Sequence, residues 1–219
     1  AKDKVMMGAE RKSMVMKDEE KKLTAYHESG HAILAFILPA SDPIHKATII
    51  PRGRSLGMVM RLPEDDRYSM TREKLNADIA VAMGGRVAEE MTFGYDKVTS
   101  GASSDIEQAT KVAKSMVTKW GMSDAIGPIL HEASNQEFIS MDKANLIDEE
   151  VKRIVMLGYQ TAQTLLKKHK KDLSKLAEAL LKYETLNGDE IKSLLTSKDF
   201  TKGNDDASSN YSSGRKTTL

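Results

Sequence analysis

The stretch LTAYHESGHAILAFIL, residues 23–38, combines a helical pattern with the residue types of a metal site. Its apolar and small residues recur at steps of three and four, which is the spacing of one face of an α-helix. These residues are Leu23, Tyr26, Gly30, Ile33, Leu34 and Ile37. Pro39 and Pro43 then end the pattern, because proline cannot continue a helix. The sequence therefore predicts one long helix over about 18–38.

Within this helix, His27, Glu28 and His31 fit the pattern H-E-x-x-H. Positions four apart lie about 40° from each other around a helix, so both imidazoles project from one face and can bind a single metal ion. Glu28 points off that axis, where it can take a proton from a metal-activated water and deliver it to a leaving amine. Imidazole and carboxylate ligands favour zinc over Ca²⁺ and Mg²⁺. The alternative, two histidines packed in a helix core, is disfavoured by the rarity of the pattern and by the space that Gly30 leaves.

A catalytic zinc ion needs a third protein ligand, and several residues outside the motif qualify by type. Glu89 and Glu90 lie at the end of a predicted helix, and second-helix glutamates have this role in several zinc peptidases. Asp105 is the other strong candidate, since a carboxylate in the first turn of a helix is stabilised by the helix dipole, although a plain helix-start acid has the same pattern. Spacing alone does not decide whether one of these glutamates or Asp105 is the third ligand. The other histidines are expected at the surface: His45, His131 and His169.

The rest of the chain predicts a mainly α-helical fold with a small β-hairpin or sheet. Two β-type runs, 46–50 and 57–62, flank a turn-prone segment. Thr71 is a suitable N-cap for the next helix. Ser104 and Glu107 have the spacing of a capping box, which would place Asp105 first in a further helix that Gly121 ends. Helical periodicity returns at the segments 145–168, 172–182 and 189–195.

Composition excludes several classes of protein. The chain has no cysteine, which excludes a disulfide framework and a cysteine nucleophile, so any metal must be held by His, Asp or Glu. Lys and Arg number 33 against 32 Asp and Glu, and because this balance gives no overall field, no nucleic-acid partner is expected. No apolar run approaches the length of a membrane span, and residues 1–22 lack the apolar core of a secretory signal.

Several stretches, in the same order along the chain, resemble the peptidase domain of the FtsH family, which are membrane-anchored ATP-dependent zinc metalloproteases. They are TAYHESGHA at 24–32, TIIPRG at 48–53, GGRVAEE at 84–90, TSGASSDI at 99–106, MVTKWGMS at 116–123 and KYETL at 182–186. The resemblance extends over about 1–195. It is specific, because several independent motifs agree.

The resemblance implies a mostly helical HExxH zinc peptidase domain, in which His27, His31 and Asp105 bind one zinc ion and Glu28 is the catalytic base. It favours Asp105 over Glu89, and so does the helix dipole, because Glu89 lies late in a helix whose negative end disfavours another anion. In the family, the strand region near 48–60 flanks the active site and would receive an extended substrate by strand addition. The substrate-binding residues expected there are Ile49, Ile50, Met58 and Val59.

The resemblance also implies an endopeptidase that degrades unfolded or membrane proteins within a homo-oligomer, expected to be a hexamer, together with an AAA ATPase module. Its expected location is the bacterial inner membrane with the peptidase domain facing the cytoplasm, or an organelle membrane in a eukaryote. The chain departs from the whole family pattern, because it has no G-x-x-x-x-G-K-[ST] phosphate loop and no membrane span. ATP and the membrane would therefore be reached only through segments absent from this chain.

We accordingly expect a soluble peptidase part with three segments. Residues 1–16 would connect to the ATPase module, residues 17–198 would form the zinc peptidase domain, and residues 199–219 would be a disordered polar tail. Two other functions stay open. A non-catalytic helical assembly module is disfavoured by the intact Glu28, since a structural metal site needs no base. A zinc hydrolase of small amides would need a closed pocket, whereas an accessible β edge suits a polypeptide.

Overall fold

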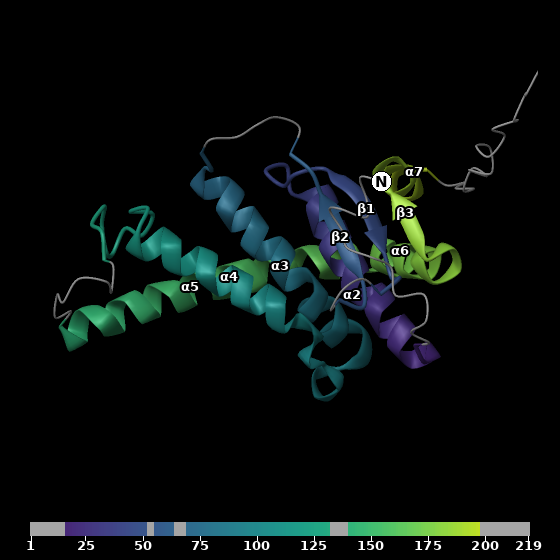
Figure 1. Cartoon of the computed structure of the whole chain (residues 1–219), viewed down its shortest axis with the longest axis horizontal. Coiled ribbons are helices and arrows are strands. Elements are labelled where there is room, and N and C mark those ends of the chain that lie inside the picture. Colours follow the sequence, from purple (N-terminus) through teal and green to yellow (C-terminus); the bar gives the residue numbers. More distant parts are fainter. Residues whose placement is uncertain (1–15, 52–54, 64–68, 132–139, 198–219) are drawn as a thin grey trace, which may run out of the picture.

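The computed structural model describes residues 16–51, 55–63, 69–131 and 140–197, which form a group of packed helices with a small sheet along one side (Figure 1). The helices of this part are α2 (Asp18–Ile37), α3 (Arg72–Phe93), α4 (Ser103–Thr118), α5 (Met141–Lys168), α6 (Lys170–Tyr183) and α7 (Gly188–Thr196). Two 3-10 turns, η1 (Tyr95–Lys97) and η2 (Ser100–Ala102), connect α3 to α4. The prediction of a mainly helical fold with a small sheet is confirmed.

Helix α2 is the central element, buried along most of its length between Thr24 and Ala35. It packs against α3 and α6, and its crossing with α3 is unusually close at one point. A Cβ atom added to Gly30 would overlap the carbonyl oxygen of Gly84, and one added to Gly84 would lie 2.8 Å from the backbone of Gly30. Two glycines therefore allow the two helix backbones to touch, which brings the histidines of α2 directly against α3.

The sheet has three antiparallel strands in the order β2-β1-β3, with β1 (Ile44–Thr48) in the middle. Strand β2 (Met58–Arg61) pairs with it as the predicted hairpin, in a register that includes Ala47 opposite Val59. The third strand, β3 (Thr185–Asn187), was not predicted, because three residues between two helices carry no alternating pattern. Since β3 occupies the other edge of β1, the outer edge of β2 has no strand partner among the described residues.

Helix α4 begins earlier than its sequence suggests. η2 runs directly into it, so that Ser103 is its first residue and Asp105 its third, and the predicted cap at Ser104 is wrong. The helix ends at Thr118, and Gly121 beyond it has a left-handed backbone with a φ of +60°. A Cβ atom at Gly121 would lie 2.7 Å from the Cα atom of Pro128, so glycine is required for this turn.

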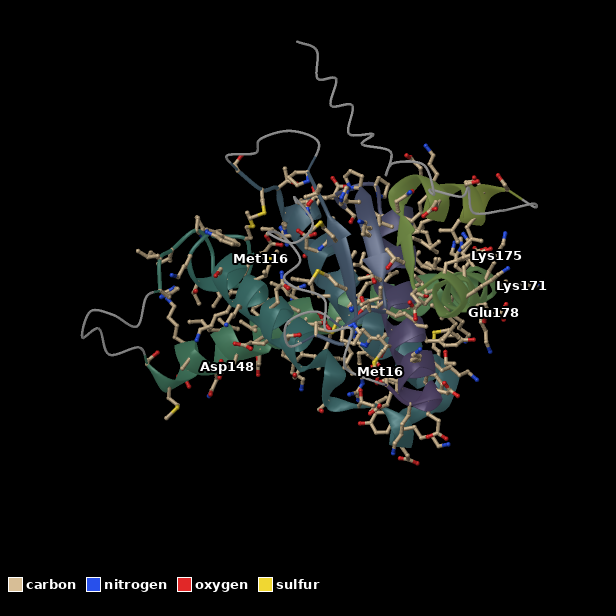
Figure 2. All side chains as sticks on the ribbon, turned by 45° about the vertical axis from the view of Figure 1, so that its right-hand side comes forward. Met16, Met116, Asp148, Lys171, Lys175 and Glu178 are labelled. Atoms are coloured by element: carbon tan, nitrogen blue, oxygen red, sulfur yellow. The ribbon has the colours of Figure 1, made fainter. Side chains whose placement is uncertain are left out.

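The core lies between the helices and the inner face of the sheet. Figure 2 shows Met116 of α4 among the packed helices, whereas Lys171 and Glu178 of α6 and Asp148 of α5 project into solvent. The largest fully buried apolar side chains of the core are Ile33, Leu34, Leu75, Ile79, Met116, Leu166, Leu173, Leu176, Leu180, Leu186 and Ile191. These residues come from every helix of the described part and from β3, so this part of the chain folds around one core.

No helix within the described ranges is long and apolar enough to cross a membrane. The expected connection at 1–16 and the expected tail at 199–219 fall on residues outside the described part, apart from Met16, which is buried.

Candidate active site

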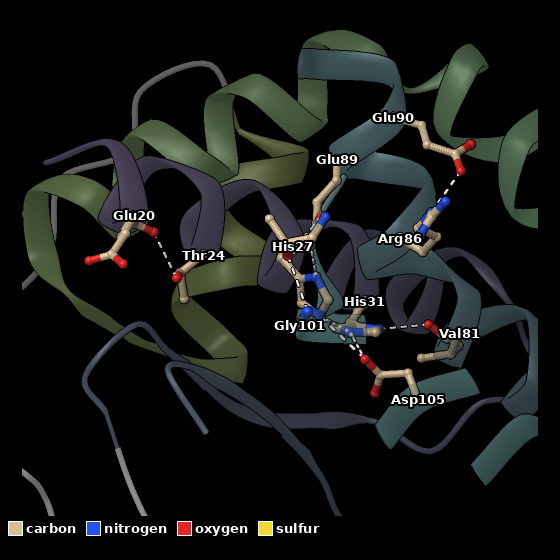
Figure 3. A network of polar contacts seen from close by, with 11 residues as sticks. Glu20, Thr24, His27, His31, Val81, Arg86, Glu89, Glu90, Gly101 and Asp105 are labelled. Carbon is tan, nitrogen blue, oxygen red and sulfur yellow. Dashed lines mark hydrogen bonds and ion pairs between the residues drawn. The ribbon is translucent and has the colours of Figure 1, made fainter. Parts of the chain in front are cut away.

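Three side chains from two helices meet at one point beside the crossing of α2 and α3 (Figure 3). The Nε2 atoms of His27 and His31 lie 3.0 Å apart. Oδ2 of Asp105, in the first turn of α4, lies 3.3 Å from Nε2 of His27 and 3.6 Å from that of His31. Both histidines are buried, with 8% of their surface exposed. The structure thus brings together the three residues that the sequence nominated as metal ligands.

The spacing of these atoms suits a zinc ion. A tetrahedral zinc ion with bonds of about 2.0–2.1 Å holds its ligand atoms about 3.3 Å apart, and the observed separations of 3.0, 3.3 and 3.6 Å are centred on that value. The opposite nitrogen of His31, Nδ1, lies 2.7 Å from the carbonyl oxygen of Val81. Because a carbonyl only accepts, this Nδ1 carries a proton, and Nε2 is the nitrogen that would bind a metal ion. A metal cation at this point would be bound by the two Nε2 atoms and by the negatively charged carboxylate of Asp105.

The pKa shifts at the site also indicate that a positive charge is favoured there. Burial lowers the pKa of His27, but hydrogen bonds to Asp105 and Glu89 outweigh burial and raise that pKa to about 10. Burial raises the pKa of Asp105, yet hydrogen bonds from His27 and His31 outweigh it and hold the pKa well below its usual range. The surroundings therefore favour a positive charge between these side chains.

Glu28 lies next to His27 in α2, and its side chain lines a cavity together with the two histidines. It is buried, and burial raises its pKa, while the charges of His31 and His27 oppose that shift. Gly57, which precedes β2, packs directly on the carboxyl group of Glu28. A Cβ atom added at Gly57 would lie only 2.6 Å from Oε1 of Glu28. The absence of a side chain at Gly57 lets the start of β2 approach the proposed base.

Glu89 contacts the site from the opposite side of His27. Its Oε1 atom lies 2.7 Å from Nδ1 of His27, and its Oε2 atom accepts a hydrogen bond of 2.8 Å from the backbone N–H of Thr99. Burial raises the pKa of Glu89, but the bonds from His27 and Thr99 outweigh it and lower the pKa. An ionised Glu89 therefore fixes the orientation of His27 and lies outside the group of three ligand atoms.

The other sequence candidates for the third ligand lie elsewhere. Glu90 accepts hydrogen bonds from Arg86, at 2.7 Å, and from Tyr159. His169 is paired with Asp172. His27, His31 and Asp105 form the metal-ligand group of the described residues, and neither His45 nor His131 belongs to it.

A cavity of about 370 Å³ opens over the metal-ligand group. Met58 and Val59 of β2, two of the four residues that the sequence analysis expects to bind substrate, line it. Ile49 does not, because its side chain is buried in the core, and Ile50 is also outside the lining. The cavity is also lined by residues of η2 and α4 that the sequence did not place at the site: Gly101, Ser104 and Gln108.

Two further groups at the site were missed. A Cβ atom at Gly85 would overlap the imidazole of His27, so this glycine makes room for the ring. Arg61 and Asp78 both line the cavity and are bonded to each other at 2.7 Å. The GGRVAEE motif was the available signal for Gly85, whereas nothing local marks Arg61 and Asp78, which are 17 residues apart.

Comparison with known proteins agrees with this geometry. The model of peptidase family M41 matches residues 14–194, which is most of the chain and includes all the site residues described above. The chain belongs to peptidase family M41. That membership confirms the predicted class, a metallopeptidase of the FtsH type.

Individual M41 relatives match nearly the whole chain. It is 61% identical over 207 residues to the ATP-dependent zinc metalloprotease FtsH of Rickettsia bellii, covering 90% of this chain and 32% of that protein. It is 57% identical to the protein of the same name from Neorickettsia risticii, covering 92% and 32%. The ATP-dependent zinc metalloprotease FTSH 11 of Arabidopsis thaliana, chloroplastic/mitochondrial, is 51% identical, covering 90% and 24%. The chain thus spans about a third or less of the length of these relatives.

Proposed function

We propose that this M41 chain is a zinc-dependent endopeptidase that cleaves extended, unfolded polypeptides. One observation carries the proposal: the ligand atoms of His27, His31 and Asp105 converge beside the buried carboxylate of Glu28, in a cavity lined by β2, whose outer edge has no strand partner within the described ranges. The first three residues would hold the ion. When bound, zinc supplies a Lewis acid that lowers the pKa of water and polarises the scissile carbonyl.

The protein groups carry out the proton transfers. Glu28 is next to His27 in α2 and reaches the same cavity, so its carboxylate accepts a proton from the attacking water and returns it to the departing amine. Glu89 and the carbonyl of Val81 hold the two imidazoles by their Nδ1 atoms and keep the Nε2 atoms directed at the ion. A structural metal site has no use for a buried base at this position, so the geometry favours catalysis over an assembly module.

The cavity suits a polypeptide better than a small amide. The outer edge of β2 presents backbone N–H and C=O groups, which an extended chain can pair with by strand addition. Met58 and Val59 line the cavity where such a chain would pass, and residues of η2 and the first turns of α4 line it as well. A substrate held this way extends beyond the cavity at both ends, which an enclosed small-molecule pocket would not allow.

The properties of the whole protein are further parts of the proposal. The relatives are named ATP-dependent, and this chain spans about a third of them. An AAA ATPase module elsewhere in the protein would therefore unfold substrates, with the chain working as one unit of a homo-hexamer. We also propose attachment to a bacterial inner membrane, or to an organelle membrane in a eukaryote, with the peptidase domain on the cytoplasmic side and with unfolded or membrane proteins as substrates.

Degradation of an unstructured protein by the zinc-loaded chain tests the central proposal. We expect the wild-type chain to cleave it, a chelator to stop cleavage and added zinc to restore it. Glu28→Gln should keep its zinc and its fold but lose about a hundredfold or more in kcat, because the amide cannot accept the proton. Glu178→Gln, on the exposed surface of α6, is the matched control and should cleave normally. Cleavage by Glu28→Gln at the wild-type rate would refute the assignment.

A further inference from the structure

Four charged side chains form a cluster beside the proposed active site, and two of them, Arg61 and Asp78, line the cavity. Asp78 of α3 accepts hydrogen bonds from Nζ of Lys74, at 2.6 and 2.7 Å, and from Nη1 of Arg61, at 2.7 Å. Lys74 also contacts Asp42 at 3.0 Å, and Arg61 also donates to Oγ of Ser41 at 3.1 Å. Two cations and two anions balance each other, and the Lys74 side chain is only 7% exposed. The cluster is thus a largely buried, charge-neutral network, in which each partner depends on the others.

This network joins three separate parts of the fold. Arg61 is the last residue of β2, Lys74 and Asp78 occupy the first two turns of α3, and Ser41 and Asp42 lie between α2 and β1. The ladder between β1 and β2 is irregular at this end, because two steps along β1, from Ile44 to Lys46, match one step along β2, from Arg61 to Met60. Such a bulge turns a side chain away from its regular direction and is common beside active sites. The bulge lies opposite Arg61, at the end of β2 where the Arg61 side chain contacts Asp78 of α3.

The same segment of α3 also holds His31, a proposed zinc ligand, in place. Val81, whose carbonyl oxygen accepts from His31, follows Asp78 by three residues, which is about one helical turn. Arg61 and Asp78 themselves line the cavity together with Met58, Val59 and Val81. The ion pair therefore connects the strand that borders the cavity with the helix that orients a proposed zinc ligand.

We propose that the Arg61–Asp78 ion pair is a substrate-positioning device, which fixes the outer edge of β2 relative to the metal centre. This inference rests on the proposed peptidase function. Neither residue takes part in bond cleavage. Arg61 acts through β2, by holding the edge against which an extended peptide pairs, so its loss weakens peptide binding and leaves the chemical step intact. A pair that only stabilised the fold would change stability and leave the KM of the remaining folded enzyme unchanged.

The test compares Arg61→Met, which keeps the length of the side chain but removes its charge, with Arg153→Met. Arg153 forms an ion pair with Glu150 at 2.7 Å on α5 and does not line the cavity, so it is a matched control. We expect Arg61→Met to raise the KM for an unstructured peptide about tenfold, with kcat within about twofold of wild type. The KM of Arg153→Met should not change, and both variants should retain zinc.

Two further measurements make the result decisive. In the Glu28→Gln background, the Kd of a fluorescent peptide should rise by the same factor in Arg61→Met, and this binding assay does not depend on cleavage. Asp78→Asn should raise KM similarly, and the double variant should be no worse than either single variant, because the two residues act as a unit. Arg61→Gln replaces Arg61→Met if the methionine variant does not fold.

An unchanged KM and Kd in a folded Arg61 variant would overturn the inference, and so would equal losses of kcat and zinc. Failure of the wild-type chain to cleave any unfolded substrate would instead refute the proposed function, and the peptide Kd would then decide the role of Arg61.

Discussion

Nδ1 of His27 and Oε1 of Glu89 lie 2.7 Å apart, across the crossing of α2 and α3 and 62 residues apart in the chain. This bond fixes the histidine from the side opposite the metal-ligand group. The HExxH helix therefore supplies two of the proposed zinc ligands but does not orient them alone. The carboxylate of Glu89 and the carbonyl of Val81, both on α3, set the direction of the two imidazoles.

The roles of Asp105 and Glu89 can be separated by metal affinity. Asp105→Asn should lose bound zinc, because an amide is a far poorer ligand than a carboxylate. Glu89→Gln should keep a zinc site but bind the ion about 10- to 100-fold more weakly, since it orients a ligand without contacting the ion. Competition with a chelator of known affinity measures both, with Glu178→Gln as the control. Full zinc occupancy in Asp105→Asn together with metal loss in Glu89→Gln would contradict the assignment and make Glu89 the third ligand.

Gly85 should matter for the metal site and not for the fold. A methyl group there would overlap the imidazole of His27, so Gly85→Ala should displace the ring and weaken zinc binding at least tenfold. Alanine is the better helix former by about 1 kcal/mol, so α3 itself should not be destabilised. Urea unfolding of the zinc-free protein and zinc titration measure the two effects separately. A loss of stability with unchanged zinc affinity would show that Gly85 serves packing instead.

Glu150 should make stability depend on pH in the acid range. Hydrogen bonds from Arg153 and Ser123 lower the pKa of Glu150 to about 2. Because the pKa is lower in the folded state, the stabilisation is complete above the ordinary value of 4.5 and is lost as the pH falls from there toward 2. Glu150→Gln should therefore flatten the dependence of the unfolding free energy on pH over that interval. An equal slope in Glu150→Gln and in wild type would contradict the prediction, and Glu178→Gln is the control.

Local patterns in the sequence predicted most of the helices, the hairpin and the two histidines of the metal-ligand group. HExxH needs only its own helix to place two imidazoles on one face, so His27 and His31 could be identified without knowledge of the fold. Asp105 could not be chosen by spacing, because its position depends on how η2 leads into α4. The same limit applies to β3, which exists only because β1 offers it an edge. Arg61 and Asp78 were missed since only the packing of β2 near α3 brings them together.

Strand addition at β2 predicts an alternating requirement for backbone N–H groups in the substrate. In a strand paired with β2, the N–H groups of every second residue point toward β2 and those between point away. Two unstructured peptides of identical sequence can carry N-methyl groups at three alternate positions, with the two sets shifted by one residue and the scissile amide left unmodified. One peptide loses three ladder hydrogen bonds, each contributing about 0.5–1.5 kcal/mol, so its kcat/KM should fall more than tenfold. Its counterpart keeps those bonds and should be cleaved close to the unmodified rate. Equal cleavage of the two peptides by the zinc-loaded chain would show that the substrate is not held by the edge of β2, and that the cavity recognises side chains alone.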